Sequence, residues 1–342
     1  MSKKVCLLVH GPFSGNAYSE IFSSLKNSRE KNIFEKIVFS VYKDDEKMTK
    51  EALLPLMSQT NTNCEIVCSE DVFNPGFFNI NRQINLVSKG LENLPDDCAV
   101  IKLRNDQWVD FDAVLRNLPR IQRENKILTT NCFSRKDRLY HPSDLLLVGS
   151  HENLKIYYDA PKLSNTHFET EYFFKMARLS LSDFQREFVP PEAYLCREYL
   201  KRKGWKIENT FKDSDRALKS FFILVNTWNV GLRWKKERNP RLRSGTIILP
   251  YTFSVSPFLG APVEHARCYS EADFTGEQKL KDKYFLLFAR VLFLTRPPFR
   301  RRLFFYSKRN IQNFSENSLI KKLVFSRTFS SIRKKVKSLM LN

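Results

Sequence analysis

A carboxylate that directly follows a short apolar stretch is the most informative feature of the sequence. Residues 98–103 have the composition of a buried strand, and Arg104, Asn105 and Asp106 follow at once. Because ligands in open α/β sheets bind at the carboxyl ends of the strands, we expect Asp106 to face a binding crevice. A carboxylate placed there can hold Mg²⁺ or Mn²⁺, and the metal can hold the diphosphate of a nucleotide-sugar. The alternative is that Asp106 caps a helix or closes a turn.

A second candidate contact follows the first apolar segment. Residues 5–10 predict a strand, and the loop after it, residues 11–16, starts with Gly11 and has a second glycine at position 15. Backbone N–H groups of such a loop could approach a phosphate or a nucleotide. The loop matches neither the dinucleotide-binding fingerprint nor the phosphate-binding P-loop, which counts against dehydrogenases and NTPases. An ordinary turn is the other interpretation.

These residues need a sheet to position them, and the first 110 residues alternate between strand-like and helix-like segments. The strand candidates are rich in Val, Ile, Leu and Phe without regular alternation, which is typical of a parallel sheet buried on both faces. Strands separated by helices predict a doubly wound α/β fold. The predicted strands are 5–10, 36–42, 64–68 and 99–103, and the helices between them are 18–27, 50–58 and 81–91. Later elements are helices over 111–123 and 191–201, strands over 126–132 and 145–148, and strands or irregular segments at 221–234 and 246–258.

Arg104-Asn105-Asp106 is followed along the chain by His141-Pro142-Ser143-Asp144, a leucine-rich stretch to Gly149 and Pro191-Glu192-Ala193-Tyr194. This order of motifs resembles the WavE family of lipopolysaccharide-synthesis proteins, which look like glycosyltransferases of the GT-A fold. The resemblance implies a GT-A-like (Rossmann-like), mostly parallel sheet flanked by helices. Many GT-A enzymes carry Asp-x-Asp where this chain has Arg104-Asn105-Asp106, so an arginine replaces the first carboxylate. Its planar fork suits phosphate oxygens. The resemblance covers residues 1–255, and its matching positions are Arg82, Gln83, Arg104, Asp106, Asp144, Gly149 and Glu192.

The resemblance also implies how a donor substrate is held. The donor would be a nucleotide-sugar, and a divalent metal, Mn²⁺ or Mg²⁺, would be the cofactor. Asp106 would position the metal and the donor diphosphate, and arginine side chains would offset the phosphate charge. The residues implied in donor binding are Gly11, Arg82, Arg104 and Asp106.

A catalytic carboxylate is expected in the second half of the domain, as in inverting GT-A enzymes. The candidates are Asp144, Glu171 and Glu192, one of which would deprotonate the acceptor hydroxyl as general base. Asp144 immediately precedes the apolar run 145–148, so we expect it at the edge of a buried strand. The alternatives are a simple turn for Asp144 and the first turn of a helix for Glu192, which follows two prolines.

Length and composition are those of a globular protein with a substantial core. The 342 residues leave room for one large domain with additions or for two smaller ones, and 42% of them are hydrophobic. No apolar run reaches the roughly 18 residues of a membrane-spanning helix, and the N-terminus does not resemble a signal peptide. The seven cysteines are odd in number and scattered, which disfavours a zinc site and suits a reducing cytoplasm.

Positive charge is concentrated at the end of the chain. The formal net charge is +20, and residues 283–342 contain 15 Lys or Arg and a single acid, Glu316. Basic clusters alternate there with aromatic and aliphatic ones, which is the composition of an amphipathic helical segment at a membrane surface. Each basic residue near an anionic bilayer contributes roughly 1 kcal/mol, so several together would hold the protein there. A helix packed on the body with its charges in water is the alternative.

These features predict a GT-A-like glycosyltransferase domain over residues 1–282 and a basic, aromatic-rich membrane-surface tail over residues 283–342. We expect transfer of a sugar to a lipopolysaccharide-core or other lipid-linked glycan acceptor, in the cytoplasm on the inner face of the cytoplasmic membrane. A nucleic-acid-binding protein that uses the basic tail is a weaker alternative, since the body has no basic stripe or recognisable nucleic-acid-binding motif. A catalytically silent GT-A-like scaffold at the membrane is the third interpretation.

Overall fold

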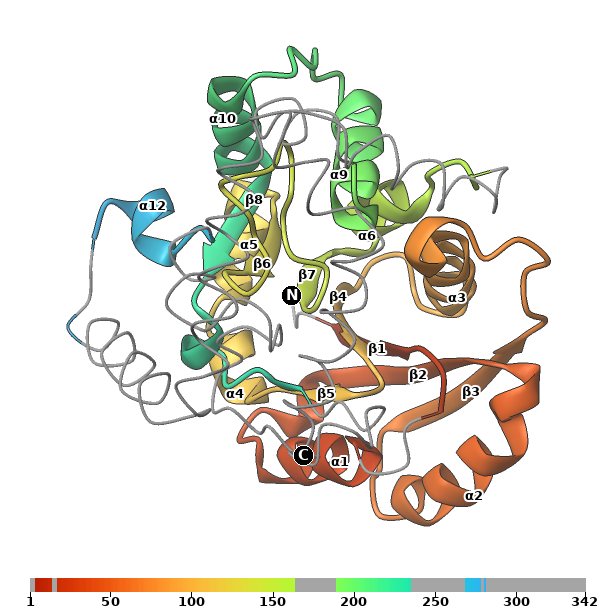
Figure 1. The fold of residues 1–342 in the computed structure, drawn as a ribbon. Coiled ribbons are helices and arrows are strands. Elements are labelled where there is room, and N and C mark those ends of the chain that lie inside the picture. The colour runs from red at the N-terminus through yellow and green to blue at the C-terminus, as the bar shows by residue number, and fades with distance from the viewer. Residues whose placement is uncertain (1–3, 14–16, 164–188, 235–267, 278–279, 281–342) are drawn as a thin grey trace, which may run out of the picture.

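A seven-stranded sheet forms the centre of the part of the chain that the computed structural model describes, which is residues 4–13, 17–163, 189–234, 268–277 and 280 (Figure 1). The strand order is β3-β2-β1-β4-β7-β6-β8. β7 runs antiparallel to both neighbours, and the other neighbouring pairs are parallel. The strands are β1 (Val5–His10), β2 (Phe34–Tyr42), β3 (Asn63–Ser69), β4 (Ala99–Arg104), β6 (Ile127–Thr130), β7 (Leu147–Ser150) and β8 (Phe222–Val225).

Both faces of the sheet are covered, because successive side chains enter two different hydrophobic clusters. In β1, Val5, Leu7 and Val9 belong to the first cluster, and Cys6 and Leu8 belong to the second. Figure 1 shows α1 and α2 on one side of the sheet and α3 on the other. The first cluster is completed by α1 (Ala17–Asn27), α2 (Glu46–Met57), α4 (Phe111–Leu115) and α5 (Leu118–Glu124), and the second by α3 (Ile80–Glu92), α6 (His151–Tyr158), α9 (Pro191–Arg202) and α10 (Phe211–Phe221).

Short elements complete the described structure. A second, two-stranded antiparallel sheet pairs the segment just after β4 with a segment beyond β8. A capping box, in which the side chains of Ser270 and Asp273 each bond to the other's backbone, starts the last described helix. These elements are β5 (Gln107–Trp108), β9 (Arg233–Trp234), α12 (Glu271–Thr275), and the 3₁₀ turns η1 (Lys31–Ile33), η2 (Lys43–Asp45), η3 (Phe77–Asn79) and η4 (Thr227–Asn229).

The α/β class, with a mostly parallel sheet flanked by helices, is confirmed. The predicted strand 5–10 coincides with β1, and β4 extends the predicted strand 99–103 by one residue, to Arg104. The lack of regular alternation in these strands is explained by burial on both faces: all six residues of β1 are buried. Apolar composition was therefore a sufficient signal for the strands that carry the predicted donor-binding residues.

Two predicted elements differ from the structure. The single helix expected over 111–123 is wrong, because α4 ends at Leu115 and α5 begins at Leu118. Pro119 lies in the first turn of α5, where its missing N–H costs no helical hydrogen bond, whereas inside a continuous helix it would. The strand expected over 145–148 begins later, at Leu147, so Asp144 lies three residues before β7 and not directly at its edge.

Some predictions fall on residues outside the described structure. These are the segment 246–258 and the basic tail 283–342, and with the tail its amphipathic helical character and the domain boundary at residue 282. Among the described residues, no helix is both long and apolar enough to cross a membrane.

Candidate functional site

The carboxyl ends of β1 and β4 bring the two predicted donor-binding segments together. His10 and Arg104 are direct partners in the parallel register, and the Asn105 amide donates to the His10 carbonyl at 2.9 Å. The Asn105 side chain in turn donates to the carbonyl of Pro12. Gly11 has φ +131°, and a Cβ there would lie 2.9 Å from Asn105 Oδ1. A glycine is therefore required where the first loop meets the turn after β4.

Arg104 and Asp106 form an ion pair at this edge. Arg104 Nη2 lies 3.1 Å from one carboxylate oxygen of Asp106, and Arg104 Nε lies 3.2 Å from the other. This two-point geometry is the strong form of a guanidinium–carboxylate contact. The Asp106 side chain is only 15% exposed. The structure thus places Asp106 at the carboxyl end of β4, as the sequence predicted, with both of its oxygens facing an arginine.

This arrangement does not fit a metal site built by the protein alone. The described residues contain no group of three or more His, Cys, Asp or Glu side chains that could hold a metal ion. Asp106 is a single carboxylate, and the arginine beside it offsets its charge. Mg²⁺ that is held by one or two carboxylates usually takes its remaining ligands from substrate phosphates and water. The predicted requirement for Mn²⁺ or Mg²⁺ stays a prediction.

Asp144 is held by three elements around the same edge. Gln83 Nε2, on α3, donates to the Asp144 carboxylate at 2.6 Å, and Lys102 Nζ, on β4, donates to its backbone carbonyl. The preceding carbonyl, of Ser143, accepts from Thr129 Oγ1 on β6 at 2.7 Å. Asp144 is 7% exposed. A residue predicted at the edge of a strand is instead fixed from both its backbone and its side chain.

Lys102 is a buried charge that sequence reasoning did not select as a site residue. Its side chain is fully buried, and its ammonium lies 5.8 Å from the centre of the Tyr158 ring. Burial lowers the pKa of Lys102 to about 8, although the charge of Asp144 acts in the opposite direction. The signal in the sequence was a lysine inside an otherwise apolar strand, which normally carries no charge on either face.

Glu192 has an elevated pKa at the start of α9. Burial, then the negative charge of Asp144, raises its pKa to about 7, while Arg138 and Arg104 act to lower it. His141 Nε2 lies 3.8 Å from the Glu192 carboxylate. Burial and the nearby arginines hold the pKa of His141 well below its usual value, so this ring is neutral at pH 7. A carboxyl group that titrates near neutrality is suited to general acid–base work.

We call Asp144, Glu192, Lys102, Gln83 and Tyr158 the carboxylate cluster. Its members come from β4, α3, α6, α9 and the loop before β7. Gln83 bridges two of them, since its Nε2 also lies 3.5 Å from the Tyr158 hydroxyl.

His10 is a second buried group that sequence reasoning missed. It ends β1, is 4% exposed, and neither ring nitrogen has a hydrogen-bond partner among the described residues. Burial, together with the charges of Lys102 and Arg104, holds its pKa well below the usual value. A polar last residue in an otherwise apolar strand was the only signal.

The remaining candidates lie elsewhere. Arg82 is on α3, but its side chain is 41% exposed and its guanidinium pairs with Asp71, with Nε 2.9 Å from Oδ1. Its neighbour Gln83, which the resemblance also matched, points instead to Asp144. Glu171 lies outside the described residues. The structure therefore brings Gly11, Arg104 and Asp106 to the ends of two adjacent strands, with Asp144 and Glu192 electrostatically linked to Arg104.

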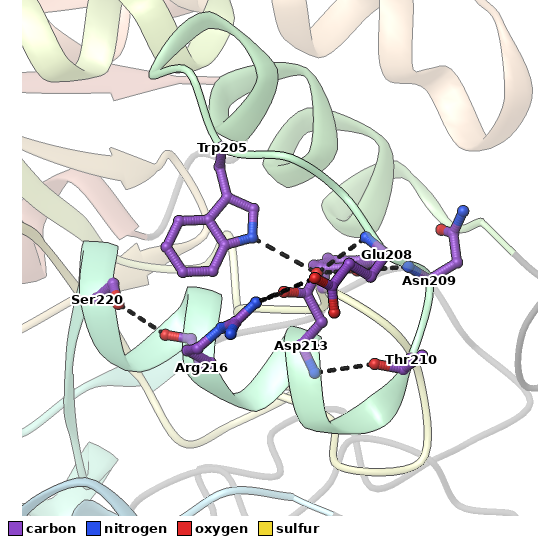
Figure 2. Close-up of polar contacts among 8 residues, drawn as sticks. Trp205, Glu208, Asn209, Thr210, Asp213, Arg216 and Ser220 are labelled. Carbon is purple, nitrogen blue, oxygen red and sulfur yellow. Dashed lines mark hydrogen bonds and ion pairs between the residues drawn. The ribbon is translucent and has the colours of Figure 1, made fainter.

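A separate buried carboxylate anchors the loop that leads to Asp144 (Figure 2). Asp213, on α10, accepts from the Tyr140 hydroxyl at 2.6 Å, from the Glu208 amide at 3.1 Å and from Arg216 Nη2 at 2.8 Å. Burial acts to raise the pKa of Asp213, but these hydrogen bonds bring it below the usual value. The Tyr140 amide also donates to Ser214 Oγ at 2.7 Å. These contacts fix the residue just before His141.

We call Asp213 and its partners the Asp213 cluster. Figure 2 shows how the side chains of Trp205 and Arg216 converge on Asp213 from the loop before α10 and from α10 itself. Its members are Asp213, Tyr140, Trp205, Glu208 and Arg216.

No protein-family model matches the chain, and no curated protein matches it in sequence. Among solved structures, the apo form of mouse xyloside xylosyltransferase 1 has 10% identity and a TM-score of 0.37, over 66% of this chain and 86% of that one. A putative glucose-1-phosphate thymidylyltransferase from Bacillus anthracis has 7% identity and a TM-score of 0.35, over 71% and 91%. The 4-diphosphocytidyl-2C-methyl-D-erythritol synthase of Anaerococcus prevotii has 13% identity and a TM-score of 0.33, over 51% and 83%. These likenesses are too low to assign an activity, and the resemblance to the WavE family stays a prediction.

Proposed function

We propose that the protein is a glycosyltransferase that moves a sugar from a nucleotide-sugar to an acceptor hydroxyl. One juxtaposition carries the proposal. The loop at Gly11 and the Arg104–Asp106 pair share the carboxyl edge of the sheet, and a partly buried carboxyl group with a pKa of about 7, Glu192, is electrostatically linked to Arg104. The Gly11 loop and Arg104 are suited to bind a diphosphate, and Glu192 is suited to deprotonate a hydroxyl group.

The donor would bind where β1 and β4 end. Backbone N–H groups of the Gly11 loop and the guanidinium of Arg104 would face the diphosphate, with Arg82 further out on α3. Asp106 would orient Arg104 through its two-point contact. Mn²⁺ or Mg²⁺, if it takes part, would have to arrive with phosphate oxygens as its main ligands, because Asp106 alone does not form a site.

Glu192 is the best-supported general base among the proposed carboxylates. The Asp144 carboxylate already accepts a hydrogen bond from Gln83 at 2.6 Å, whereas the one ion-pair contact of Glu192 among the described residues is to His141 at 3.8 Å. A base whose pKa lies near 7 is ionised often enough to act and still binds a proton well. Asp144 is the second candidate, and Glu171 is the third.

The acceptor we propose is a lipopolysaccharide-core or other lipid-linked glycan. The support is the basic, aromatic-rich composition of residues 283–342, together with the WavE resemblance of the preceding body. Such a tail would keep the domain formed by residues 1–282 on the inner face of the cytoplasmic membrane, next to a lipid-anchored substrate. Sedimentation with anionic liposomes, in competition with nucleic acid, would test the tail separately from catalysis.

Thermal stabilisation by a panel of UDP, GDP, ADP and CMP compounds, with and without Mn²⁺, tests the donor site. A ligand that binds only the folded state raises the melting temperature by mass action. We expect one nucleotide to stabilise the wild type and to lose its effect in Asp106→Ala. Asp215→Ala is the matched control, because Asp215 also forms an ion pair, with Lys219 at 2.8 Å, but on α10 and with both side chains at least 40% exposed.

Three outcomes of this experiment distinguish the proposed function from its alternatives. A nucleotide-specific shift that survives Asp215→Ala and disappears in Asp106→Ala supports the donor site, and its dependence on Mn²⁺ decides the metal. No shift with any nucleotide would overturn the proposal and favour a nucleic-acid-binding or scaffolding protein. Tight donor binding without sugar transfer to any acceptor would favour the catalytically silent scaffold.

A further inference from the structure

A short run of basic residues ends α9 and leads into α10. Residues 201–212 contain five basic residues and a single acid, Glu208. Acidic residues on either side balance the run, so it does not stand out as a basic stripe in the sequence. We call residues 201–212 the basic turn, and its basic members are Lys201, Arg202, Lys203, Lys206 and Lys212.

Positive charge on the basic turn is available to a partner in solution. Lys206 and Lys212 are exposed and form no ion pair among the described residues. Lys201 is 59% exposed even though it pairs with Glu198 at 2.6 Å. Exposed cations that only solvent compensates can meet an anionic surface without first losing a protein partner.

Apolar side chains lie among these charges. Phe211, the first residue of α10, is 38% exposed and directly precedes Lys212. Trp205 and Ile207 also lie between the basic residues, and both pack partly against the second hydrophobic cluster. Apolar side chains that can enter the headgroup boundary, with Lys and Arg beside them, are typical of segments that lie on membranes.

The Asp213 cluster holds the basic turn in place (Figure 2). The Glu208 amide donates to Asp213 at 3.1 Å, and the indole N–H of Trp205 donates to it at 3.5 Å. The amide of Asn209 donates to the Tyr140 hydroxyl at 2.9 Å. A surface fixed in this way loses little conformational entropy when it binds a partner.

Two connections relate the basic turn to the proposed general base. Glu192 lies in the first turn of α9 and Lys201 in the last, so about 14 Å of helix separates them. At the other end, Tyr140 is followed directly by His141, whose Nε2 lies 3.8 Å from the Glu192 carboxylate. A membrane bound at the basic turn would therefore hold a lipid-linked acceptor close to Glu192.

The aromatic residues of the basic turn fit a bilayer better than a nucleic acid. Proteins that bind single strands stack bases on open aromatic faces. The Arg216 guanidinium lies over the Trp205 ring, 5.2 Å from its centre, and so covers one face of it. Ile207 is aliphatic and offers no ring for stacking.

We propose that the basic turn is a docking surface for an anionic lipid bilayer. This inference rests on the membrane location that is part of the proposed function, and it does not depend on the chemistry of sugar transfer. Electrostatic attraction by the lysines brings the turn to the headgroups, and Phe211 enters the boundary between headgroups and acyl chains.

The test measures binding of the full-length protein to vesicles of phosphatidylglycerol and phosphatidylcholine. Lys206→Glu/Lys212→Glu reverses the two unpaired charges, so the partition coefficient should fall about 20-fold or more. The matched control is Lys26→Glu/Lys47→Glu, which changes the net charge equally through exposed lysines of α1 and α2, on the other side of the sheet. Its partition coefficient should fall less than about threefold, because salt screens distant surface charges.

Fluorescence reports separately whether the apolar side chain enters the bilayer. The emission that Phe211→Trp adds to the wild-type spectrum should shift to shorter wavelength with the anionic vesicles and not with phosphatidylcholine alone. Leu54→Trp is the control, since Leu54 is 57% exposed on α2, and its emission should not shift. No shift with Phe211→Trp would overturn the inference, whether or not the charge variants fold.

Other outcomes also decide the matter. Equal losses in the two double variants, or no loss in either, would overturn the inference and leave the tail as the membrane contact. Tighter binding to single-stranded DNA than to vesicles, lost only in Lys206→Glu/Lys212→Glu, would assign the basic turn to nucleic acid instead. A wild type that binds no vesicles would overturn the inference together with the proposed membrane location. The expected vesicle results without stabilisation by any nucleotide would refute sugar transfer and leave the docking surface standing.

Discussion

The Asp213 cluster and the carboxylate cluster are built from similar groups but behave differently. Both contain a buried carboxylate, a tyrosine and a cationic side chain. In the first, every oxygen of Asp213 accepts hydrogen bonds, and the pKa of the carboxyl group is lowered. In the second, Glu192 is opposed by a neighbouring negative charge, and its pKa is raised to about 7. A polar cluster in which every group has a hydrogen-bond partner stabilises the fold. A cluster that places two carboxyl groups near each other instead shifts a pKa, and such a shift is typical of functional sites.

The two clusters are joined by a short stretch of the chain. Tyr140 belongs to the Asp213 cluster, and Asp144 lies four residues later in the carboxylate cluster. The Asp213 cluster therefore fixes one end of a short loop whose other end carries Asp144, the residue whose charge raises the pKa of Glu192. A loop restrained in this way can keep Asp144 near a second carboxyl group, because contacts elsewhere in the fold offset the cost of placing two acidic side chains together.

The largest expected effect is a loss of activity when the carboxylate cluster is changed. Glu192→Gln keeps the size of the side chain and removes the proton acceptor, so kcat/KM for sugar transfer should fall about 10²–10⁴-fold. The free energy of unfolding at pH 7 should stay the same or rise, since a partly buried carboxyl group with an elevated pKa is lost. Initial rates and urea unfolding measure the two quantities.

Glu198→Gln is the control for that substitution. Glu198 is also on α9, but it pairs with Lys201 at 2.6 Å and has no contact with the carboxylate cluster among the described residues. Its substitution should leave kcat/KM within about twofold of wild type. Full activity in Glu192→Gln would mean that Asp144 or Glu171 is the general base. The difference between the two clusters would then have no role in catalysis.

The next effect falls on stability. Asp213→Ala leaves the Tyr140 hydroxyl and the Glu208 amide without their acceptor, so the free energy of unfolding should drop by about 2–4 kcal/mol. Asp215→Ala, two residues along the same helix, removes an exposed ion pair with Lys219 and should cost less than about 0.5 kcal/mol. Urea unfolding of the three proteins measures the difference. Equal losses would mean that the Asp213 cluster is not a stabilising anchor.

The two carboxyl groups should also give opposite pH dependences of stability. Glu192 has a folded-state pKa near 7, above its usual 4.5, so the folded state binds the extra proton and loses stability as pH rises from 4.5 to 7. Glu192→Gln should therefore be more stable than wild type by about 1–3 kcal/mol at pH 8 and equal to it at pH 4. Asp213 has a lowered pKa, so its contribution is complete above pH 3.8 and is lost on further acidification.

Unfolding curves from pH 3 to pH 8 would measure these slopes. The gap between wild type and Asp213→Ala should narrow as the pH falls below about 4, because the carboxyl group is protonated there in the unfolded state and, at still lower pH, in the folded state as well. The gap between wild type and Glu192→Gln should open above pH 5. If the free energy of unfolding had the same pH dependence in all three proteins, the proposed difference between Asp213 and Glu192 would be wrong.

The sequence predicted the strands of the site better than its polar contacts. Continuous apolar runs were enough to find β1 and β4, because burial on both faces leaves few polar positions in them: His10 in β1, and Lys102 and Arg104 in β4. The split between α4 and α5 was missed even though Pro119 marks it, since the apolar pattern continues across the break. The antiparallel direction of β7 was not predictable, because direction is set by contacts with β4 and β6 that lie far apart in sequence.

The candidate residues show the same limit. Gly11 and Asp106 were found because loops at strand ends are recognisable. Lys102 and His10 were missed, since nothing in a sequence says that a polar residue of a strand is buried, with one hydrogen bond to a distant loop for Lys102 and no ring partner among the described residues for His10. The elevated pKa of Glu192 depends on Asp144, 48 residues earlier in the chain, which only the fold brings close.

The smallest expected effect compares two adjacent residues of α3. Arg82 pairs with Asp71 and is 41% exposed, so Arg82→Ala should lower the free energy of unfolding by less than about 1 kcal/mol. If the guanidinium contacts the donor, KM for the nucleotide-sugar should rise a few-fold while kcat stays unchanged, because the contact is made equally in the ground state and the transition state.

Gln83→Leu should have the opposite kinetic pattern. It removes the hydrogen bond that holds the Asp144 carboxylate at 2.6 Å, so the effect should appear in kcat and in the acid limb of the pH profile, with little change in donor KM. Steady-state kinetics of both variants across pH would compare them directly. The same pattern in both would mean that the first turn of α3 acts as one surface, and the division between an outer donor contact at Arg82 and an inner support at Gln83 would be wrong. Different patterns would show that the carboxylate cluster begins at Gln83, one residue inward from the exposed ion pair.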